Sequence, residues 1–397
     1  MSIKSSKKIN LVLGNIPIKG NPTIIFEKSI INFFNEISIN IKKNKRSMEY
    51  TDLMTFGFWC RKANIIKLSE NYLGKNFMLG RGNVLHIAPS NVPMNFAYSF
   101  AFGMLSGNCN IVRLPSKNFK QVEILCQIIS KICKKNKFKK ILNKFCFIKY
   151  DKSNEISSDL SKNVDARLIW GGDETITQFK MYKTPPRCID LSFSDRYSIS
   201  VIKTSELAKL TNNERKNFVR KFYNDSYLMD QQGCSSPQAI IWICDRKKEI
   251  INKFWNILHD FVKLNYEKDL SITNKKISLI AKSAIKTNIN FKTKFRDIRI
   301  VRLKTNNITP EIEKMQCHFG TFAEINIKKI SDIKKLVSKK FQTVTYFGFK
   351  SVELEKIIFK NGITGIDRIV PIGRAHDIGP VWDGYDIIYT LARIVSS

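Results

Sequence analysis

Between residues 83 and 170 the chain alternates short apolar runs with longer stretches of helical pattern. Four runs have the length of a buried strand: residues 83–88, 110–114, 145–150 and 166–170. Between them, residues 93–106 form an apolar stretch begun by proline, and residues 121–135 place their apolar side chains on one helical face. A strand, a helix and a second strand in this order make a parallel crossover unit. The alternation therefore predicts an α/β fold with an open parallel sheet.

The same pattern extends to both sides of this segment. An amphipathic helix is expected over residues 23–42, whose apolar residues recur on one helical face. Further strand candidates, with helical stretches between most of them, are residues 197–202, 239–243, 298–303, 322–327 and 343–347. A chain of 397 residues that is 43% hydrophobic can bury a substantial core, and its length indicates two or three domains.

No run approaches the roughly 20 consecutive apolar residues that cross a bilayer, so no integral membrane segment is expected. The first ten residues are basic and lack the apolar core and cleavage site of a secretion signal. The nine cysteines are scattered singly, without the paired short spacings of a zinc site or a disulfide framework. We therefore expect a cytoplasmic protein with reduced cysteines and no metal.

The net charge of +33 raises nucleic acid or an anionic membrane as partners. Lysine is, however, spread over most segments, which is typical of a bias along the whole chain rather than of a binding stripe. We predict no nucleic-acid partner on this ground. The basic run 131–144 alternates lysine with apolar residues and is interpreted as a solvated helix face, with docking of an acidic acyl donor as the alternative.

A turn with two prolines and an asparagine follows the first of these strands, at residues 86–93 (HIAPSNVP). Open α/β sheets bind ligands at the carboxyl edge, where this turn is expected. The side-chain amide of Asn91 could stabilise an oxyanion there. The alternative is a simple strand-to-helix turn, in which asparagine bonds to the local backbone.

Gly171 and Gly172 follow the expected strand at 166–170 and precede a polar helix start. Backbone amides in such a turn can approach a phosphate. A glycine pair lacks the full spacing of a dinucleotide fingerprint, so a tight turn without a ligand remains the alternative.

Cys234 lies after glycine in a polar loop, residues 230–237 (DQQGCSSP), directly before the expected strand at 239–243. This surrounding is unlike that of a core cysteine. A thiolate in such a loop can attack a carbonyl group, and a helix terminus or a cation near it would favour its ionised form. No histidine lies nearby in the sequence, and none of the four histidines is assigned a role.

From about residue 80 to its C-terminus, the chain resembles the aldehyde dehydrogenase superfamily and, within it, the long-chain fatty acyl-CoA reductases that supply aldehyde to bacterial luciferase. Pro89, Asn91 and Pro93 match a Pro-x-Asn-x-Pro turn that supplies an oxyanion-hole amide, and residues 231–234 match a Gly-Gln-x-Cys loop. The resemblance makes Cys234 the nucleophile and Asn91 the oxyanion donor. The density of Asp, Gly and aromatic residues in 365–386 is similar to that of the acyl-CoA reductase branch.

The resemblance also implies a nicotinamide cofactor, NADPH in preference to NADH. Residues 107–117 resemble, with one inserted residue, a strand that ends in Lys-Pro-Ser and contacts the cofactor's ribose or phosphate. Arg113, Pro115 and Ser116 are the nearest equivalents. Gly171 and Gly172 resemble the glycine turn beside the pyrophosphate.

Two departures from the superfamily pattern bear on the reaction. The Glu-Leu-Gly-Gly motif of the hydrolytic enzymes is replaced at residues 190–193, where Asp190 is either a site residue or a strand-edge acid. Loss of the longer acid favours reduction, since a reductase needs no base to activate water. The Glu-x-Phe-Gly segment that holds the nicotinamide ribose in many relatives is Cys-His-Phe-Gly here, at residues 317–320.

Three regions are expected from these features. Residues 1–205 would form a nucleotide-binding domain with an N-terminal helical segment, 206–350 a second α/β domain with the nucleophile, and 351–397 a return segment on the cofactor domain. The predicted function is NADPH-dependent reduction of a long-chain fatty acyl thioester to the aldehyde. The acyl donor would be acyl-CoA, or an acylated partner such as an acyl-protein synthetase or acyl carrier protein, and a homo-oligomer is expected. The alternatives are aldehyde oxidation to acids and a non-catalytic basic binding protein.

Overall fold

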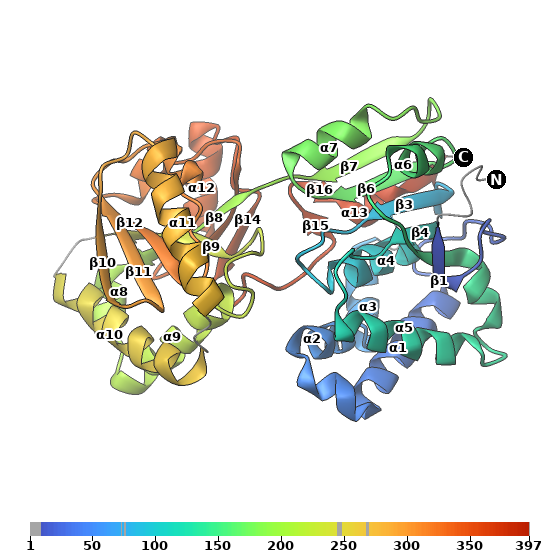
Figure 1. Cartoon of the computed structure of the whole chain (residues 1–397), viewed down its shortest axis with the longest axis horizontal. Coiled ribbons are helices and arrows are strands. Elements are labelled where there is room, and N and C mark those ends of the chain that lie inside the picture. Colours follow the sequence, from blue (N-terminus) through green and yellow to red (C-terminus); the bar gives the residue numbers. More distant parts are fainter. Residues whose placement is uncertain (1–8, 73, 75–76, 244–247, 267–269, 397) are drawn as a thin grey trace. The chain divides into compact units, whose positions relative to one another are not determined.

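The computed structural model describes residues 9–72, 74, 77–243, 248–266 and 270–396. The chain forms two compact units, drawn in Figure 1. Unit 1 comprises Met1–Ser194 together with Pro380–Ser397, and unit 2 comprises Asp195–Gly379. Each unit has its own sheet and core, and each is described separately below.

The expected boundaries at residues 205 and 350 both fall inside unit 2. Strand β8 (Tyr197–Lys203) pairs with β9 (Pro237–Ile243) and β13 (Phe341–Phe347), so it belongs to the second sheet. Strand β14 (Arg368–Pro371) pairs with β13 and keeps the chain in unit 2 well past residue 350. The return to unit 1 is therefore confined to residues 380–397.

The sheet of unit 1 has the order β1-β5-β4-β3-β6-β7. Its strands are β1 (Asn10–Gly14), β5 (Phe145–Lys149), β4 (Cys109–Arg113), β3 (Asn83–Ile87), β6 (Ala166–Trp170) and β7 (Ile189–Phe193). All pairs are parallel except β1 with β5. The chain order reverses at β3, since β4 and β5 lie on one side of it and β6 and β7 on the other.

Helices cover both faces of this sheet (Figure 1). They are α1 (Lys28–Lys43), α2 (Thr51–Trp59), α3 (Lys62–Ser69), α4 (Asn95–Leu105), α5 (Lys120–Cys133), α6 (Asn154–Ser161), α7 (Asp173–Lys180) and α13 (Ile387–Leu391), with 3-10 turns η2 (Lys45–Glu49) and η3 (Lys139–Lys144). Apolar side chains of α6 and α7 pack on one face. On the other face, aromatic rings of α1 and α4 meet Phe145 and Phe147 of β5.

The first helix begins at Lys28, later than the expected residue 23. Ile24 forms an isolated bridge with Leu79 of β2 (Phe77–Gly80), and Phe26 has a left-handed φ of 49°. Both features are incompatible with a helix. Strand β2 also pairs antiparallel with β17 (Ala392–Val395), which attaches the end of the described chain to unit 1. A small hairpin, β15 (Val381–Trp382) with β16 (Tyr385–Asp386), precedes it.

The sheet of unit 2 has the order β10-β11-β12-β9-β8-β13-β14. The strands not yet introduced are β10 (Phe291–Asp297), β11 (Ile300–Thr305) and β12 (Thr321–Ile327). Every neighbouring pair is parallel except the hairpin of β10 and β11. Strands such as β9 are buried along their whole length, as expected for a parallel sheet covered on both faces.

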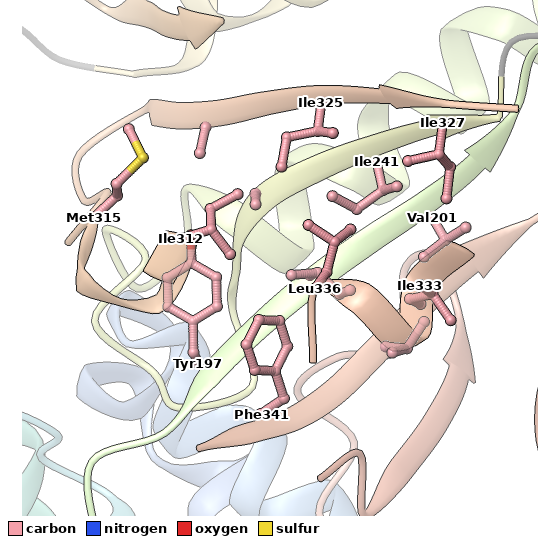
Figure 2. Close-up of a cluster of buried hydrophobic side chains, with 14 of the residues drawn as sticks. Tyr197, Val201, Ile241, Ile312, Met315, Ile325, Ile327, Ile333, Leu336 and Phe341 are labelled. Carbon is pink, nitrogen blue, oxygen red and sulfur yellow. The ribbon is translucent and has the colours of Figure 1, made fainter. Parts of the chain in front are cut away.

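Two apolar cores cover the two faces of the unit 2 sheet. Helices α8 (Thr204–Lys209), α9 (Asn212–Ser226) and α10 (Lys248–Asn265) supply the first core. Helices α11 (Leu270–Lys286) and α12 (Ser351–Asn361), with the 3-10 turns η4 (Pro310–Lys314) and η5 (Ile330–Lys335), supply the second. Figure 2 shows Tyr197, Val201 and Ile241 of the strands beside Ile312 and Leu336 in this second core.

The predicted α/β class with parallel sheets is confirmed, and every strand expected from the sequence is present within a few residues. None of the helices in the described part of the chain combines the length and apolarity that a membrane crossing requires.

Candidate active site

Three of the predicted motifs of unit 1 follow neighbouring parallel strands. The Asn91 turn follows β3, Arg113 ends β4, and Gly171 follows β6. Since β3 lies between β4 and β6, these residues share the carboxyl edge of the sheet, at the point where its strand order reverses. Ligands of open α/β sheets bind at such a switch point.

Asn91 is exposed at the carboxyl edge of unit 1. The turn leads into α4, which begins at Asn95 rather than at Pro93 and has no acidic residue in its first turn. The Asn95 Oδ1 atom is buried and has no hydrogen-bond partner among the described residues.

Beneath this edge, His86 joins β3 to the elements around it. Asn110 Oδ1 can only accept, so His86 Nε2–H donates to it at 2.8 Å, and His86 Nδ1 accepts from the Ser99 hydroxyl at 2.8 Å. The Trp170 indole N–H donates to the same Ser99 oxygen at 3.1 Å. Burial lowers the pKa of His86 to about 4, so its imidazole is neutral and structural. Gly103 of α4 lies so close that a Cβ there would be 1.9 Å from Asn110 Oδ1.

Arg113 turns toward the end of β5. Its guanidinium lies 4.2 Å from the centroid of the Tyr150 ring and donates to the Tyr150 carbonyl oxygen at 3.2 Å. Pro115 is buried and Ser116 is exposed. The structure therefore places a cation and a hydroxyl on the carboxyl edge of the sheet, beside the Asn91 turn.

The glycine turn after β6 is held by a backbone bond from Gly171 N–H to the Phe193 carbonyl at 3.2 Å. The preceding Trp170 stacks on Phe193 with ring centroids 3.9 Å apart. Gly172 is the N-cap of α7, but Asp173 and Glu174 occupy the first turn of this helix. Their negative charges oppose the attraction that a helix N-terminus has for phosphate.

Asp190 forms an ion pair with Arg167. Its two carboxylate oxygens accept from Arg167 Nε at 2.7 Å and Nη2 at 2.6 Å. Arg167 is almost fully buried and also donates to the Phe179 carbonyl at 2.8 Å. This bidentate pair supports a structural role for the acid, on the strand-edge alternative that the sequence left open.

In unit 2, Cys234 lies in a loop that leads from α9 into the amino end of β9. Asp230 and Gln231 at the start of this loop have left-handed φ values of 51° and 56°. The buried Gln231 side chain accepts from Gly320 N–H at 2.7 Å and donates to the carbonyls of Pro237 and Thr321 at 3.0 and 2.9 Å. These bonds hold the loop against the starts of β9 and β12, which offsets the cost of the uncommon backbone conformation.

The Cys234 side chain is half-buried. The amide of Gln342, in β13, donates to its sulfur at 3.5 Å, and the Ser198 hydroxyl of β8 donates to its carbonyl oxygen at 2.6 Å. Contacts from two neighbouring strands therefore fix both the backbone and the thiol of the predicted nucleophile.

The other described cysteines are unlike Cys234; Cys244 lies outside the described residues. Of the seven others, only Cys188 is also partly exposed, and burial with the charge of Asp190 raises its thiol pKa to about 11. The remaining six are buried, and burial raises the thiol pKa to about 12 for four of them: Cys126, Cys133, Cys146 and Cys317. A raised pKa keeps a thiol protonated and unreactive. None of the eight described cysteines forms a disulfide bond, and among the described residues no three side chains of metal-binding type are placed to hold an ion.

His376 and Arg368 lie beside the Cys234 loop, a proximity that was not predicted from the sequence. His376 approaches the Ser235 and Ser236 hydroxyls at 3.3 and 3.4 Å, and Arg368 interacts electrostatically with Cys234. Both belong to the segment 365–386 that the resemblance singled out without a role. More than 130 residues separate them from Cys234, and no local pattern reports such a contact.

Cys317 occupies the glutamate position of the Glu-x-Phe-Gly pattern, and His318 follows it. The His318 Nδ1–H donates to the Gln231 carbonyl at 2.9 Å, and burial lowers the pKa of His318. The neighbouring Phe319 has a φ of 57°, and its N–H donates to the Asp230 carbonyl at 3.0 Å. In this chain the segment therefore supports the nucleophile's loop.

A family model described as acyl-CoA reductase (LuxC) matches residues 59–396. The chain belongs to this family. It is 20% identical over 311 residues to a long-chain acyl-protein thioester reductase of Aliivibrio fischeri, a match that covers 75% of this chain. The chain spans 61% of that relative's length.

The fold is that of the aldehyde dehydrogenases. Lactaldehyde dehydrogenase from Escherichia coli is similar, with a TM-score of 0.63 and 12% identity over 92% of this chain and 85% of that one. The glyceraldehyde-3-phosphate dehydrogenase GapN from Methanocaldococcus jannaschii, complexed with NADP, has a TM-score of 0.61 and 13% identity over 97% and 91%. The predicted membership of the acyl-CoA reductase family is confirmed, and so is the predicted aldehyde-dehydrogenase-like fold.

Proposed function

We propose that this member of the acyl-CoA reductase family reduces a long-chain fatty acyl thioester to the fatty aldehyde, with Cys234 as the acyl carrier. The main support is the thiol itself, which is half-buried in a braced loop while the other described cysteines are either buried or held protonated. The relative from Aliivibrio fischeri is named for acyl-protein thioesters. The donor proposed here is accordingly acyl-CoA or an acylated protein, such as an acyl-protein synthetase or acyl carrier protein.

The first step is transfer of the acyl group between two sulfur atoms. The Cys234 thiolate attacks the carbonyl carbon of the donor thioester, and the tetrahedral oxyanion collapses with loss of the donor's thiolate, which takes up a proton. The side-chain amide of Asn91 is the proposed donor to this oxyanion, a role in which a single hydrogen bond contributes roughly 3 to 4 kcal/mol. The product is an acyl-cysteine, itself a thioester.

The carboxyl edge of unit 1 fits a nicotinamide dinucleotide. It lies at the switch point of the sheet and carries the Arg113 cation and the exposed Ser116 hydroxyl. Arg113, Pro115 and Ser116 would hold the cofactor on one side, and Gly171 and Gly172 on the other by resemblance. The acids at the start of α7 favour a phosphate contact near Arg113 over one at the glycine pair.

NADPH, in preference to NADH, is the proposed cofactor; when bound it would supply the hydride that carries two electrons to the acyl carbon. Cys234 then leaves as the thiolate when the carbon–sulfur bond breaks, and the aldehyde is released. The protein's part is to keep water from the acyl-cysteine. Asp190 is unavailable as a base for water because both of its oxygens are bonded to Arg167, which favours reduction over the oxidative alternative.

Intact-protein mass spectrometry with myristoyl-CoA tests this proposal. The wild type should gain one acyl group without cofactor and lose it as tetradecanal forms when NADPH is added. Cys234→Ala should gain none, whereas Cys188→Ala, the matched change at the other half-exposed thiol, should behave as the wild type. If the wild type forms no adduct with either myristoyl-CoA or a myristoylated acyl carrier protein, the proposal is wrong. NADH in place of NADPH, and the mass of the native assembly, test the predicted cofactor preference and homo-oligomer.

A further inference from the structure

The nucleophile's loop is contacted by a second loop, residues 372–377, which follows β14. The His376 ring lies against the hydroxyls of Ser235 and Ser236, and a Cβ on Gly233 would be 3.4 Å from His376 Cε1. The residues on both sides of Cys234 therefore pack on one imidazole. Burial lowers the pKa of His376 to about 4, so this imidazole is neutral at physiological pH and brings no positive charge.

Two charged side chains hold the 372–377 loop in place. The Arg368 guanidinium, from β14, donates to the main-chain carbonyls of Arg374 at 3.0 Å, Asp377 at 2.6 Å and Ala375. From the end of α9, the Asp225 carboxylate accepts the N–H groups of Gly373 at 2.6 Å and Ala375 at 2.9 Å. Arg368 thus determines where the His376 loop lies.

Arg368 also acts on Cys234 through its charge. Burial lowers the pKa of Arg368, and the negative charges of Asp377, Cys234 and Asp225 oppose this effect. Coulombic attraction is reciprocal, so a positive charge that is favoured by the thiolate stabilises the thiolate equally. The guanidinium stays charged in proteins, so its positive charge is present at every pH at which the thiol titrates.

The other ionisable groups of the packed elements are mostly neutral or paired. They are Lys221 and Asp225 of α9, Arg196 before β8, Asp230 in the nucleophile's loop, His318 before β12, Asp367 beside β14, and Arg374, His376 and Asp377 of the 372–377 loop. Arg196 pairs with Asp367 and Arg374 with Asp377, while Tyr266 donates to Asp230. Burial raises the pKa of Asp225 to about 6, so it is largely ionised at pH 7 and above, where its charge is attracted to Arg368.

We propose that Arg368 is a positioning residue for Cys234: it holds the 372–377 loop against the nucleophile's loop, and its charge stabilises the thiolate that attacks the substrate. The inference rests on the proposed function only in taking Cys234 as the nucleophile. It gives a role to the Arg368 segment, which the family resemblance singled out but left without one.

The test is the pH profile of Cys234 alkylation by iodoacetamide in the folded chain, read on the Cys234 peptide by mass spectrometry. Arg368→Gln should move the midpoint upward by about one pH unit, which makes alkylation about tenfold slower near neutral pH. Arg368→Lys keeps the charge and should stay near the wild type. Arg374→Gln, an exposed arginine of the same loop, is the matched control and should not move the midpoint.

An unchanged midpoint in folded Arg368→Gln, or an equal shift in Arg374→Gln, would overturn the inference. If Arg368→Gln does not fold, Arg368→Met, which also removes the charge and keeps an unbranched side chain, decides: it too should move the midpoint upward, and an unchanged midpoint overturns the proposal. Alkylation needs neither substrate nor cofactor. If the alkylation midpoint shifts in Arg368→Gln but no acyl adduct forms, the inference is supported and the proposed function is refuted. If an acyl adduct forms but the midpoint does not shift, the proposed function is supported and the inference is refuted.

Discussion

Replacement of Asp190 by asparagine separates a structural acid from a catalytic one. The side chain of Arg167 is 2% exposed and that of Asp190 25%, and two charge-assisted bonds of 2.7 and 2.6 Å join them. Removing one partner of a buried pair costs about 3 to 5 kcal/mol, because the other charge remains buried. Since water reaches Asp190 and the Phe179 carbonyl still accepts from Arg167, we expect the lower limit, about 3 kcal/mol.

Urea unfolding of four proteins measures this cost: wild type, Asp190→Asn, Arg167→Met and the double variant. The double variant should be less destabilised than the sum of the single variants by about 2 kcal/mol, because neither charge is left alone. Formation and reduction of the acyl adduct should stay within about twofold of the wild type in folded Asp190→Asn. A catalytic role for Asp190 would be indicated instead if Asp190→Asn had the same free energy of unfolding as the wild type but slowed one of these steps by about 100-fold. A loss of that size is expected when an acid–base group is removed.

For three further changes, the structure determines whether the free energy of unfolding should rise or fall. The folded pKa of His86, about 4, lies below its unfolded value of about 6.5, so roughly 3 kcal/mol of stability should be lost as pH falls through this window, and His86→Gln should lack that loss in acid unfolding curves. Burial lowers the pKa of Lys276 in α11 to about 7. Because the unfolded chain binds this proton more tightly than the folded chain, the free energy of unfolding of the wild type should rise between pH 7 and 9. The expected rise, relative to Lys276→Met, is about 2 kcal/mol. Gly103→Ala forces a Cβ into Asn110 and should cost about 1 to 3 kcal/mol in thermal unfolding, whereas Gly379→Ala, with no atom within 4 Å of the added Cβ, should cost little.

Local pattern predicted the buried parallel strands well, because a strand covered on both faces is apolar throughout. Strand β9, for example, is buried from Pro237 to Ile243. Strands β1 and β10 were not predicted, since both lie at sheet edges and pair on one side only. The sequence of β10 alternates lysine with phenylalanine and threonine, so it lacks the apolar run used to recognise its neighbours.

The candidate site, too, was predicted in part. The Cys234 thiol and the Asn91 turn were predicted because the residues next to them in the sequence form a motif, such as Gly233 beside Cys234. The Arg167 bond to Asp190 and the His376 contact with the Cys234 loop join residues 23 and more than 140 positions apart. Nothing in their immediate neighbours distinguishes these side chains from ordinary surface charges, so their roles become visible only when the elements are packed.

Unit 1 is completed by a segment that is translated after the whole of unit 2. Strand β17 pairs with β2, the Asn108 amide donates to the Leu391 carbonyl at 2.9 Å, and Arg81 donates to the Thr390 carbonyl at 2.8 Å. The whole of unit 2 is translated before these partners exist. During synthesis, unit 2 is therefore a contiguous segment that can fold while the chain still grows, whereas Asn108 and the edge of β2 must wait for their partners until translation has passed residue 390.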